Sequence, residues 1–122
     1  MGEIVAVGIG GFIGAVMRYI VSQWIKINLG ERFPFVSLVI NVTGCFLAGI
    51  FLAIFSKRLQ IPDITKTVIM VGFLGAFTTF SAFGIETINH LKAGKPMLAM
   101  NNILLNIIMS LGAIELGLRM IK

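Results

Sequence analysis

Four long apolar segments, separated by short polar breaks, make up nearly the whole sequence. They are residues 4–25, 35–55, 67–85 and 97–118. Each is about 20 residues long, which is the length that an α-helix needs to cross the hydrocarbon core of a bilayer. The breaks contain the glycine, proline and charged residues that are common at helix ends. The pattern therefore predicts an all-α membrane protein, with four transmembrane helices in a single domain over residues 1–122.

The composition agrees with a chain that sits in a lipid bilayer. Hydrophobic residues make up 57% of the 122 residues, and charged residues only 12%. A soluble domain of this size buries only roughly 60–70% of the surface of its chain, so much of this apolar surface must face lipid. The short breaks also leave no room for a soluble catalytic lobe, and we do not expect an enzyme.

The net charge of +5 is compatible with a nucleic-acid partner, but its distribution argues against one. The ten basic residues occur in ones and twos, mostly between the apolar segments, and form no basic face. This placement is typical of interfacial anchors, and no nucleic-acid partner is expected. The single cysteine, Cys45, and the single histidine, His90, indicate neither an intrachain disulfide nor a zinc site.

The basic residues also bear on orientation, because lysine and arginine favour the cytoplasmic side of a membrane. Four spans place both termini and the second break on one side. The basic residues on that side are Lys57, Arg58, Lys66, Arg119 and Lys122, and those on the other are Lys26, Arg32, Lys92 and Lys95. Five against four is no bias, so the sequence predicts insertion in both orientations and an antiparallel pair. A single orientation, chosen for another reason, is the alternative.

Polar residues recur at helical spacing inside two of the spans. The second span has Ser37, Asn41 and Cys45, and the fourth has Asn102, Asn106 and Ser110. Residues four apart lie on one face of a helix, so each set forms a polar ladder. Polar groups at this depth mark either a helix interface or a transport pathway, and both interpretations remain open.

The charges inside the spans favour an anion over a cation as the transported species. The acidic residues are Glu3, Glu31, Asp63, Glu86 and Glu115, all at or near predicted span ends. A proton or alkali-cation pathway would require a carboxylate at membrane depth. The one clearly intramembrane charge is instead Arg18. Amide and hydroxyl donors together with a cation suit a dehydrated anion.

Glycines in the first and third spans predict special backbone packing. Gly10 and Gly14 form a small-xxx-small surface for a neighbouring helix. In the third span, two glycines precede Thr78 and Thr79, which predicts a break near residues 75–79 and unusual dihedral angles at Gly75. Carbonyls freed at such a break must be buried in protein or bind a ligand, and a hard cation such as sodium suits them.

Two phenylalanines follow this break. Phe80 and Phe83 are three residues apart and therefore lie on one side of the helix. A ring edge carries partial positive charge and can face an anion.

Taken together, these motifs resemble the Fluc (CrcB) family of fluoride channels over essentially the whole chain. The matching residues are Gly11-xx-Gly14-Ala15-xx-Arg18-Tyr19, Asn41-Val-Thr-Gly44-Cys-Phe-Leu-Ala-Gly49 and Gly72-Phe-Leu-Gly75-Ala-Phe-Thr78-Thr79-Phe80-Ser81-Ala-Phe83. The string in the third span is the most specific of the three.

The resemblance implies an antiparallel, dual-topology homodimer with two fluoride pores and a central structural sodium ion. It assigns the sodium ligands to the backbone carbonyls of Gly75 and Thr78, at a break in the third helix. The implied pore residues are Asn41, Phe80, Phe83, Thr79, Ser81 and Ser110, with Arg18 matching the family's arginine. In the fourth span many members have a tyrosine and then a serine where this chain has Asn102 and Asn106. Both asparagines are hydrogen-bond donors, so we keep them in the pathway.

The function implied by the resemblance is passive export of fluoride across the cytoplasmic (inner) membrane of a microbe. HF enters from acidic surroundings and ionises in the neutral cytoplasm, and a fluoride channel lets the trapped anion leave. This activity would give resistance to fluoride. Two alternatives remain. One is a small dual-topology multidrug exporter of the same size and span count, which needs a glutamate within its first helix. The other is a non-transporting membrane assembly subunit whose polar ladders bind partner helices.

Overall fold

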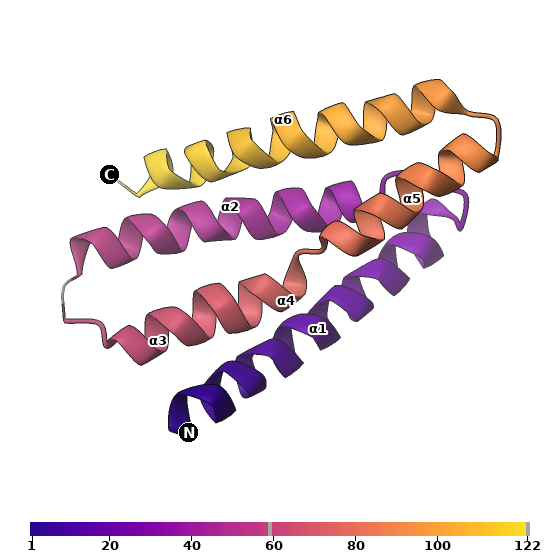
Figure 1. The fold of residues 1–122 in the computed structure, drawn as a ribbon. Helices are drawn as coiled ribbons and strands as arrows, with labels where there is room; N and C mark the ends of the chain where they lie inside the picture. Colours follow the sequence, from indigo (N-terminus) through magenta and orange to yellow (C-terminus); the bar gives the residue numbers. More distant parts are fainter. Residues whose placement is uncertain (59, 122) are drawn as a thin grey trace.

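The computed structural model describes residues 1–58 and 60–121, and every regular element in these ranges is helical (Figure 1). In chain order they are α1 (Gly2–Leu29), α2 (Val36–Lys57), α3 (Asp63–Thr67), η1 (Val68–Leu74), α4 (Gly75–Phe77), α5 (Phe80–Lys92) and α6 (Pro96–Met120). The pieces from α3 to α5 make up the third long segment, Asp63–Lys92. Within the described part of the chain, four segments are long and apolar enough to cross a membrane, which confirms the predicted transmembrane helices. Lys122, one of the basic residues counted above, lies outside the described residues.

The helices are longer than the apolar segments that predict them. The largest difference is in the third segment, which extends from Asp63 to Lys92 instead of covering residues 67–85. Polar residues at a membrane surface continue a helix readily, and this one stops only where Gly94 takes a positive φ of 74°. As a result Glu86, predicted at the end of a span, lies in the middle of α5.

The helices form two closely packed pairs (Figure 1). The first half of the third segment belongs to one pair, and its second half packs against the other. In one pair α1 packs against η1 and α4, and in the other α2 packs against α6. The third segment leaves α1 after α4, and α5 then packs mainly against α6. The start of α1 and the end of α6 lie at the same end of the molecule in Figure 1. The change of partner falls at residues 78 and 79.

Glycines set the close contact within each pair. A β-carbon at Gly10 would lie 2.7 Å from the carbonyl oxygen of Val68, and one at Gly14 would meet the carbonyl of Phe73. Likewise, a β-carbon at Gly49 would meet the carbonyl of Ile114, and Gly117 fits as closely against α2. Small residues let helix backbones approach in this way inside membranes, so the prediction that Gly10 and Gly14 form a packing surface is confirmed.

The backbone between α4 and α5 is extended. Thr78 has φ −77° and ψ 154°, and Thr79 has φ −149° and ψ 121°. These values are normal for β-branched residues, whose side chains favour extended backbone. Gly75, in contrast, has ordinary helical angles of φ −62° and ψ −36°. The expectation of unusual dihedral angles at Gly75 is therefore wrong, because the helix continues to Phe77 and the threonines take up the change in direction.

Candidate functional site

Asn41 of α2 holds the extended segment by bonding to both backbone polar groups of Thr79. Its Oδ1 accepts a hydrogen bond of 2.8 Å from the backbone N–H of Thr79, and its Nδ2 donates one of 3.1 Å to the Thr79 carbonyl. The Thr79 hydroxyl in turn accepts from the N–H of Ala82 at 3.1 Å and caps the start of α5. A half-buried side chain and a helix cap thus satisfy backbone groups that the interrupted helix cannot pair.

The same bonds leave two backbone carbonyls without their usual helical hydrogen-bond partners. In an unbroken helix the N–H of Thr79 would bond to the carbonyl of Gly75, and the N–H of Ala82 would bond to that of Thr78. Both N–H groups instead donate to side-chain oxygens of Asn41 and Thr79. The carbonyls of Gly75 and Thr78 are therefore free of these helical partners.

Arg18 of α1 binds the end of α4. Its Nε donates a 3.0 Å hydrogen bond to the carbonyl oxygen of Ala76, another group that has lost its helical partner. A cation at the C-terminus of a helix also interacts favourably with the helix dipole. The sequence singles out Arg18 as a charge inside the membrane, and the structure adds this contact.

A cavity of about 250 Å³ lies between α2, the extended segment, α5 and α6. Its lining consists of Asn41, Cys45, Thr78, Thr79, Phe80, Phe83, Asn106, Ile107 and Ser110. The rings of Phe80 and Phe83 meet edge to face, with centroids 5.3 Å apart and planes at 67°. None of these lining residues is acidic. The cavity therefore offers amides, hydroxyls and aromatic rings without a negative charge.

The cavity brings together most of the predicted pore residues. Asn41, Thr79, Phe80, Phe83, Asn106 and Ser110 all line it. The hydroxyl oxygen of Ser110 is buried and, among the described residues, has no hydrogen-bond partner. A polar atom of this kind in a cavity is a candidate ligand contact.

Two predicted pore residues do not line this cavity. Ser81 is exposed on α5, and its hydroxyl oxygen lies 3.3 Å from that of Thr79. Asn102 has 0% of its surface exposed, and its Nδ2 donates a 3.0 Å hydrogen bond to the hydroxyl of Thr87. Asn102 also accepts from Asn106, so it contacts the cavity lining from behind.

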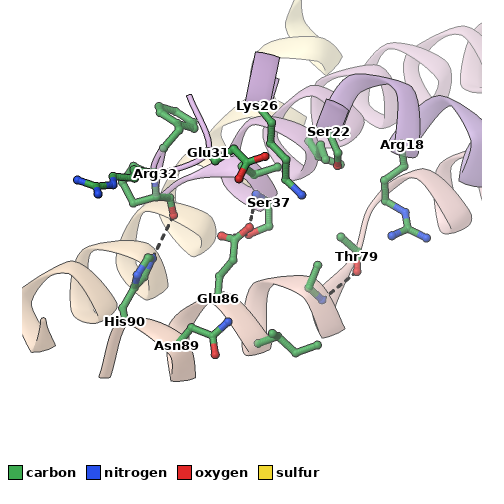
Figure 2. A pocket seen from close by; sticks show the side chains of 16 residues that line it. Arg18, Ser22, Lys26, Glu31, Arg32, Ser37, Thr79, Glu86, Asn89 and His90 are labelled. Atoms are coloured by element: carbon green, nitrogen blue, oxygen red, sulfur yellow. Dashed lines mark hydrogen bonds between the residues drawn. The ribbon is translucent and has the colours of Figure 1, made fainter. Parts of the chain in front are cut away.

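A second cavity, of about 460 Å³, opens between α1, α2 and α5 (Figure 2). Charged side chains line it: Arg18, Lys26, Arg32, Glu31 and Glu86. Glu86 is fixed by Ser37, whose N–H and hydroxyl each donate a 2.9 Å hydrogen bond to the carboxylate. Three cationic side chains against two carboxylates give this vestibule a positive balance. Thr79 lines both cavities, which are therefore neighbours at this residue.

The vestibule is not apparent from the sequence. Lys26 and Arg32 have the spacing of interfacial anchors and Glu86 that of a span end, and only the fold brings these residues together from three separate parts of the chain. The usable signal was Ser37, a polar residue at the start of a ladder, which the structure pairs with Glu86. His90 also lines the vestibule, where its Nε2 lies 3.1 Å from the carbonyl oxygen of Pro34.

The fold and these cavities define a multi-pass membrane protein with polar cavities between its helices. The family described as "CrcB-like protein, Camphor Resistance (CrcB)" matches residues 5–118, and the chain belongs to this family.

Several relatives have the name fluoride-specific ion channel FluC. The relative from Magnetococcus marinus is 41% identical over 116 residues, covering 95% of this chain and 94% of its own length. The relative from Saccharophagus degradans is 38% identical, covering 93% of this chain and 84% of its own length. A third, from Campylobacter lari, is 38% identical and covers 100% of this chain and 99% of its own length.

Proposed function

We propose that this chain is a fluoride-specific ion channel. The observation that carries the proposal is the cavity between α2, α5 and α6, whose lining contains amides, hydroxyls and phenylalanine rings and no acidic residue. Fluoride is small and strongly hydrated, so a pore must replace its water with closely placed donors. The buried hydroxyl of Ser110 is one such donor, and the edges of Phe80 and Phe83 carry partial positive charge.

The vestibule supplies the approach to this cavity. Arg18, Lys26 and Arg32 outnumber the two carboxylates there, and the resulting positive balance raises the local concentration of anions. We call the cavity between α2, α5 and α6 the inner cavity. An anion in the vestibule reaches it past Thr79, which lines both. No step of this path needs ATP or a coupling carboxylate, so conduction is passive. In the cytoplasmic membrane of a microbe it would export fluoride trapped by ionisation of HF, and thereby give resistance to it.

The proposal is tested by anion efflux from liposomes that contain the purified protein. We expect fluoride efflux, read with a fluoride-selective electrode, and no chloride efflux above that of protein-free liposomes. The physical reason is that donors placed for the smallest halide do not fit a larger one. Efflux of neither anion from liposomes with folded protein would contradict the channel proposal, and equal efflux of both would contradict its specificity.

A sodium ion fits the extended segment. The carbonyls of Gly75 and Thr78 lack their helical partners, since the N–H groups of Thr79 and Ala82 donate elsewhere. Oxygen ligands of this type suit a hard monovalent cation. Among the described residues no group of three or more His, Cys, Asp or Glu side chains could hold a metal, so backbone oxygens are the candidate ligands. When bound, the cation would offset the repulsion of converging carbonyl dipoles.

The proposal includes an antiparallel homodimer with two pores. Gly75 and Phe80 are exposed on the protomer, and Phe80 has 82% of its surface exposed although it lines the inner cavity. A second copy that covers this face would close the cavity, and two copies would supply four carbonyls to one cation. The absence of a lysine and arginine bias between the two sides supports opposite orientations of the two copies.

Dual topology is tested with a reporter fused to the C-terminus that is active on only one side of the membrane. We expect a pair of reporters with opposite requirements to give comparable signals, because five basic residues face four. Adding three lysines to one side should fix one orientation and remove activity until an oppositely biased copy is co-expressed. A wild-type chain found entirely in one orientation would disprove the prediction.

A further inference from the structure

A chain of side-chain hydrogen bonds connects the extended segment to the middle of α5 through two other helices. We call it the amide chain, and its members are Thr79, Asn41, Asn106, Asn102 and Thr87. The N–H of Thr79 donates to Asn41 at 2.8 Å, Asn41 Nδ2 to Asn106 Oδ1 at 3.1 Å, and Asn106 Nδ2 to Asn102 Oδ1 at 3.1 Å. Asn102 Nδ2 then donates to the hydroxyl of Thr87 at 3.0 Å, and that hydroxyl donates to the carbonyl of Phe83 at 2.8 Å.

All five bonds run in the same direction. The two ends of an asparagine amide have almost the same shape, so its hydrogen-bond partners decide which end points where. The hydroxyl hydrogen of Thr87 is engaged with the Phe83 carbonyl, which leaves only an accepting oxygen toward Asn102. Asn102 must therefore turn its Nδ2 to Thr87 and its Oδ1 to Asn106. By the same argument, Asn106 turns its Nδ2 to Asn102 and its Oδ1 to Asn41, and Asn41 must turn its Nδ2 to Asn106.

The orientation of Asn41 matters at the extended segment. Its two Nδ2 hydrogens go to the Thr79 carbonyl and to Asn106, and its Oδ1 accepts from the Thr79 N–H. A flipped Asn41 would place its Nδ2 donor against the Thr79 N–H and its Oδ1 acceptor against the Thr79 carbonyl. Each mismatch between these partly buried groups is costly, because it replaces a hydrogen bond by repulsion. The lining of the inner cavity thus depends on how its amides are oriented.

We propose that Thr87 is a positioning residue of the pathway, acting through Asn102 and Asn106 on Asn41 and the Thr79 backbone. Thr87 is buried, with 7% of its surface exposed, and lies outside the linings of both cavities described above. We assign Asn102 the same positioning role, in place of the direct contact with the ion that the sequence predicts for it. The proposal rests on the channel function for its flux readout, but the amide chain itself is independent of that function.

The test replaces Thr87 with valine, which keeps the shape of the side chain and removes the hydroxyl. We expect Thr87→Val to lower fluoride efflux per folded protein roughly three- to tenfold, the range for one interhelical hydrogen bond in a membrane. The effect is partial because Asn106 Nδ2 also donates to the Asn102 carbonyl at 2.9 Å, which helps to hold it. Thr87→Ser retains the hydroxyl and should restore efflux.

A second readout follows the backbone in detergent without fluoride. Thr87→Val should raise deuterium uptake in peptides covering residues 78–82, since the Thr79 N–H is bonded to Asn41, and should leave α1 peptides unchanged. The matched control is Thr67→Val, which removes a hydroxyl bonded to a carbonyl four residues earlier, Asp63, as Thr87 is to Phe83. It should change neither readout. If Thr87→Val does not fold, Asn102→Ser breaks the same link and should give the same pattern.

The possible results distinguish a failure of the positioning role from a failure of the channel function. Wild-type efflux and wild-type exchange in Thr87→Val would overturn the positioning role, as would uptake raised equally in all helices, which indicates general destabilisation. Loss of efflux without rescue by Thr87→Ser would also count against it. If the wild-type protein conducts no fluoride, the channel proposal fails, and the exchange pattern still decides whether Thr87 orders the extended segment.

Discussion

Asn41→Asp is expected to abolish fluoride efflux, with a loss of at least about a hundredfold. Aspartate keeps an oxygen for the Thr79 N–H, but its second oxygen replaces the Nδ2 donor. That oxygen would face the Thr79 carbonyl and Asn106 Oδ1, both acceptors that lie 3.1 Å from Nδ2. Loss of two partly buried hydrogen bonds costs about 1 kcal/mol each, and a negative charge in the cavity also repels the anion. Efflux from liposomes, normalised to folded protein, measures the loss.

A matched control makes the same substitution at an asparagine outside both cavities. Asn28 also donates through Nδ2, to the Trp24 carbonyl at 2.8 Å, but it is exposed near the end of α1 and lines neither cavity. Asn28→Asp should therefore conduct at close to the wild-type rate. Folded Asn41→Asp protein with undiminished efflux would mean that the cavity between α2, α5 and α6 is not the pathway.

The transmembrane helices could be predicted from the sequence, because a bilayer imposes a length and an apolar surface on any helix that crosses it. The helix ends could not. Hydropathy falls where Glu86 appears, yet α5 continues to Lys92 because a helix can extend beyond the hydrocarbon core. Nor does hydropathy show that the third segment changes partner from α1 to α6.

The candidate site was partly predictable for a similar reason. Helical spacing places Asn102, Asn106 and Ser110 on one face of α6, but it does not say which of them reaches a cavity. The structure places Asn106 and Ser110 in the lining and Asn102 behind them, against Thr87. Thr87 gave no sequence signal, because a single threonine in an apolar helix usually bonds only to its own backbone.

Gly75→Val is expected to weaken the dimer while leaving the protomer folded. Within one protomer a β-carbon at Gly75 would have one neighbour within 4 Å, the Met70 carbonyl oxygen at 3.7 Å, and Gly75 is exposed with ordinary helical angles. The first atom of a side chain at Gly75 therefore has room within the single chain. In the proposed dimer, two copies bring their Gly75 carbonyls to one sodium ion, where a branched side chain would hold the backbones apart.

The measurement is the monomer–dimer equilibrium in detergent or lipid, read by cross-linking or mass photometry. We expect Gly75→Val to weaken the dimer at least about tenfold, equivalent to about 1.4 kcal/mol. Gly8→Val is the control, since Gly8 is exposed on α1 and a β-carbon there has no neighbour within 4 Å. Replacing sodium with a larger organic cation at constant ionic strength should weaken the wild-type dimer in the same direction, because converging carbonyl dipoles then lose the charge that offsets their repulsion. A dimer insensitive to both the substitution and sodium removal would rule out the Gly75 and Thr78 carbonyls as a shared cation site.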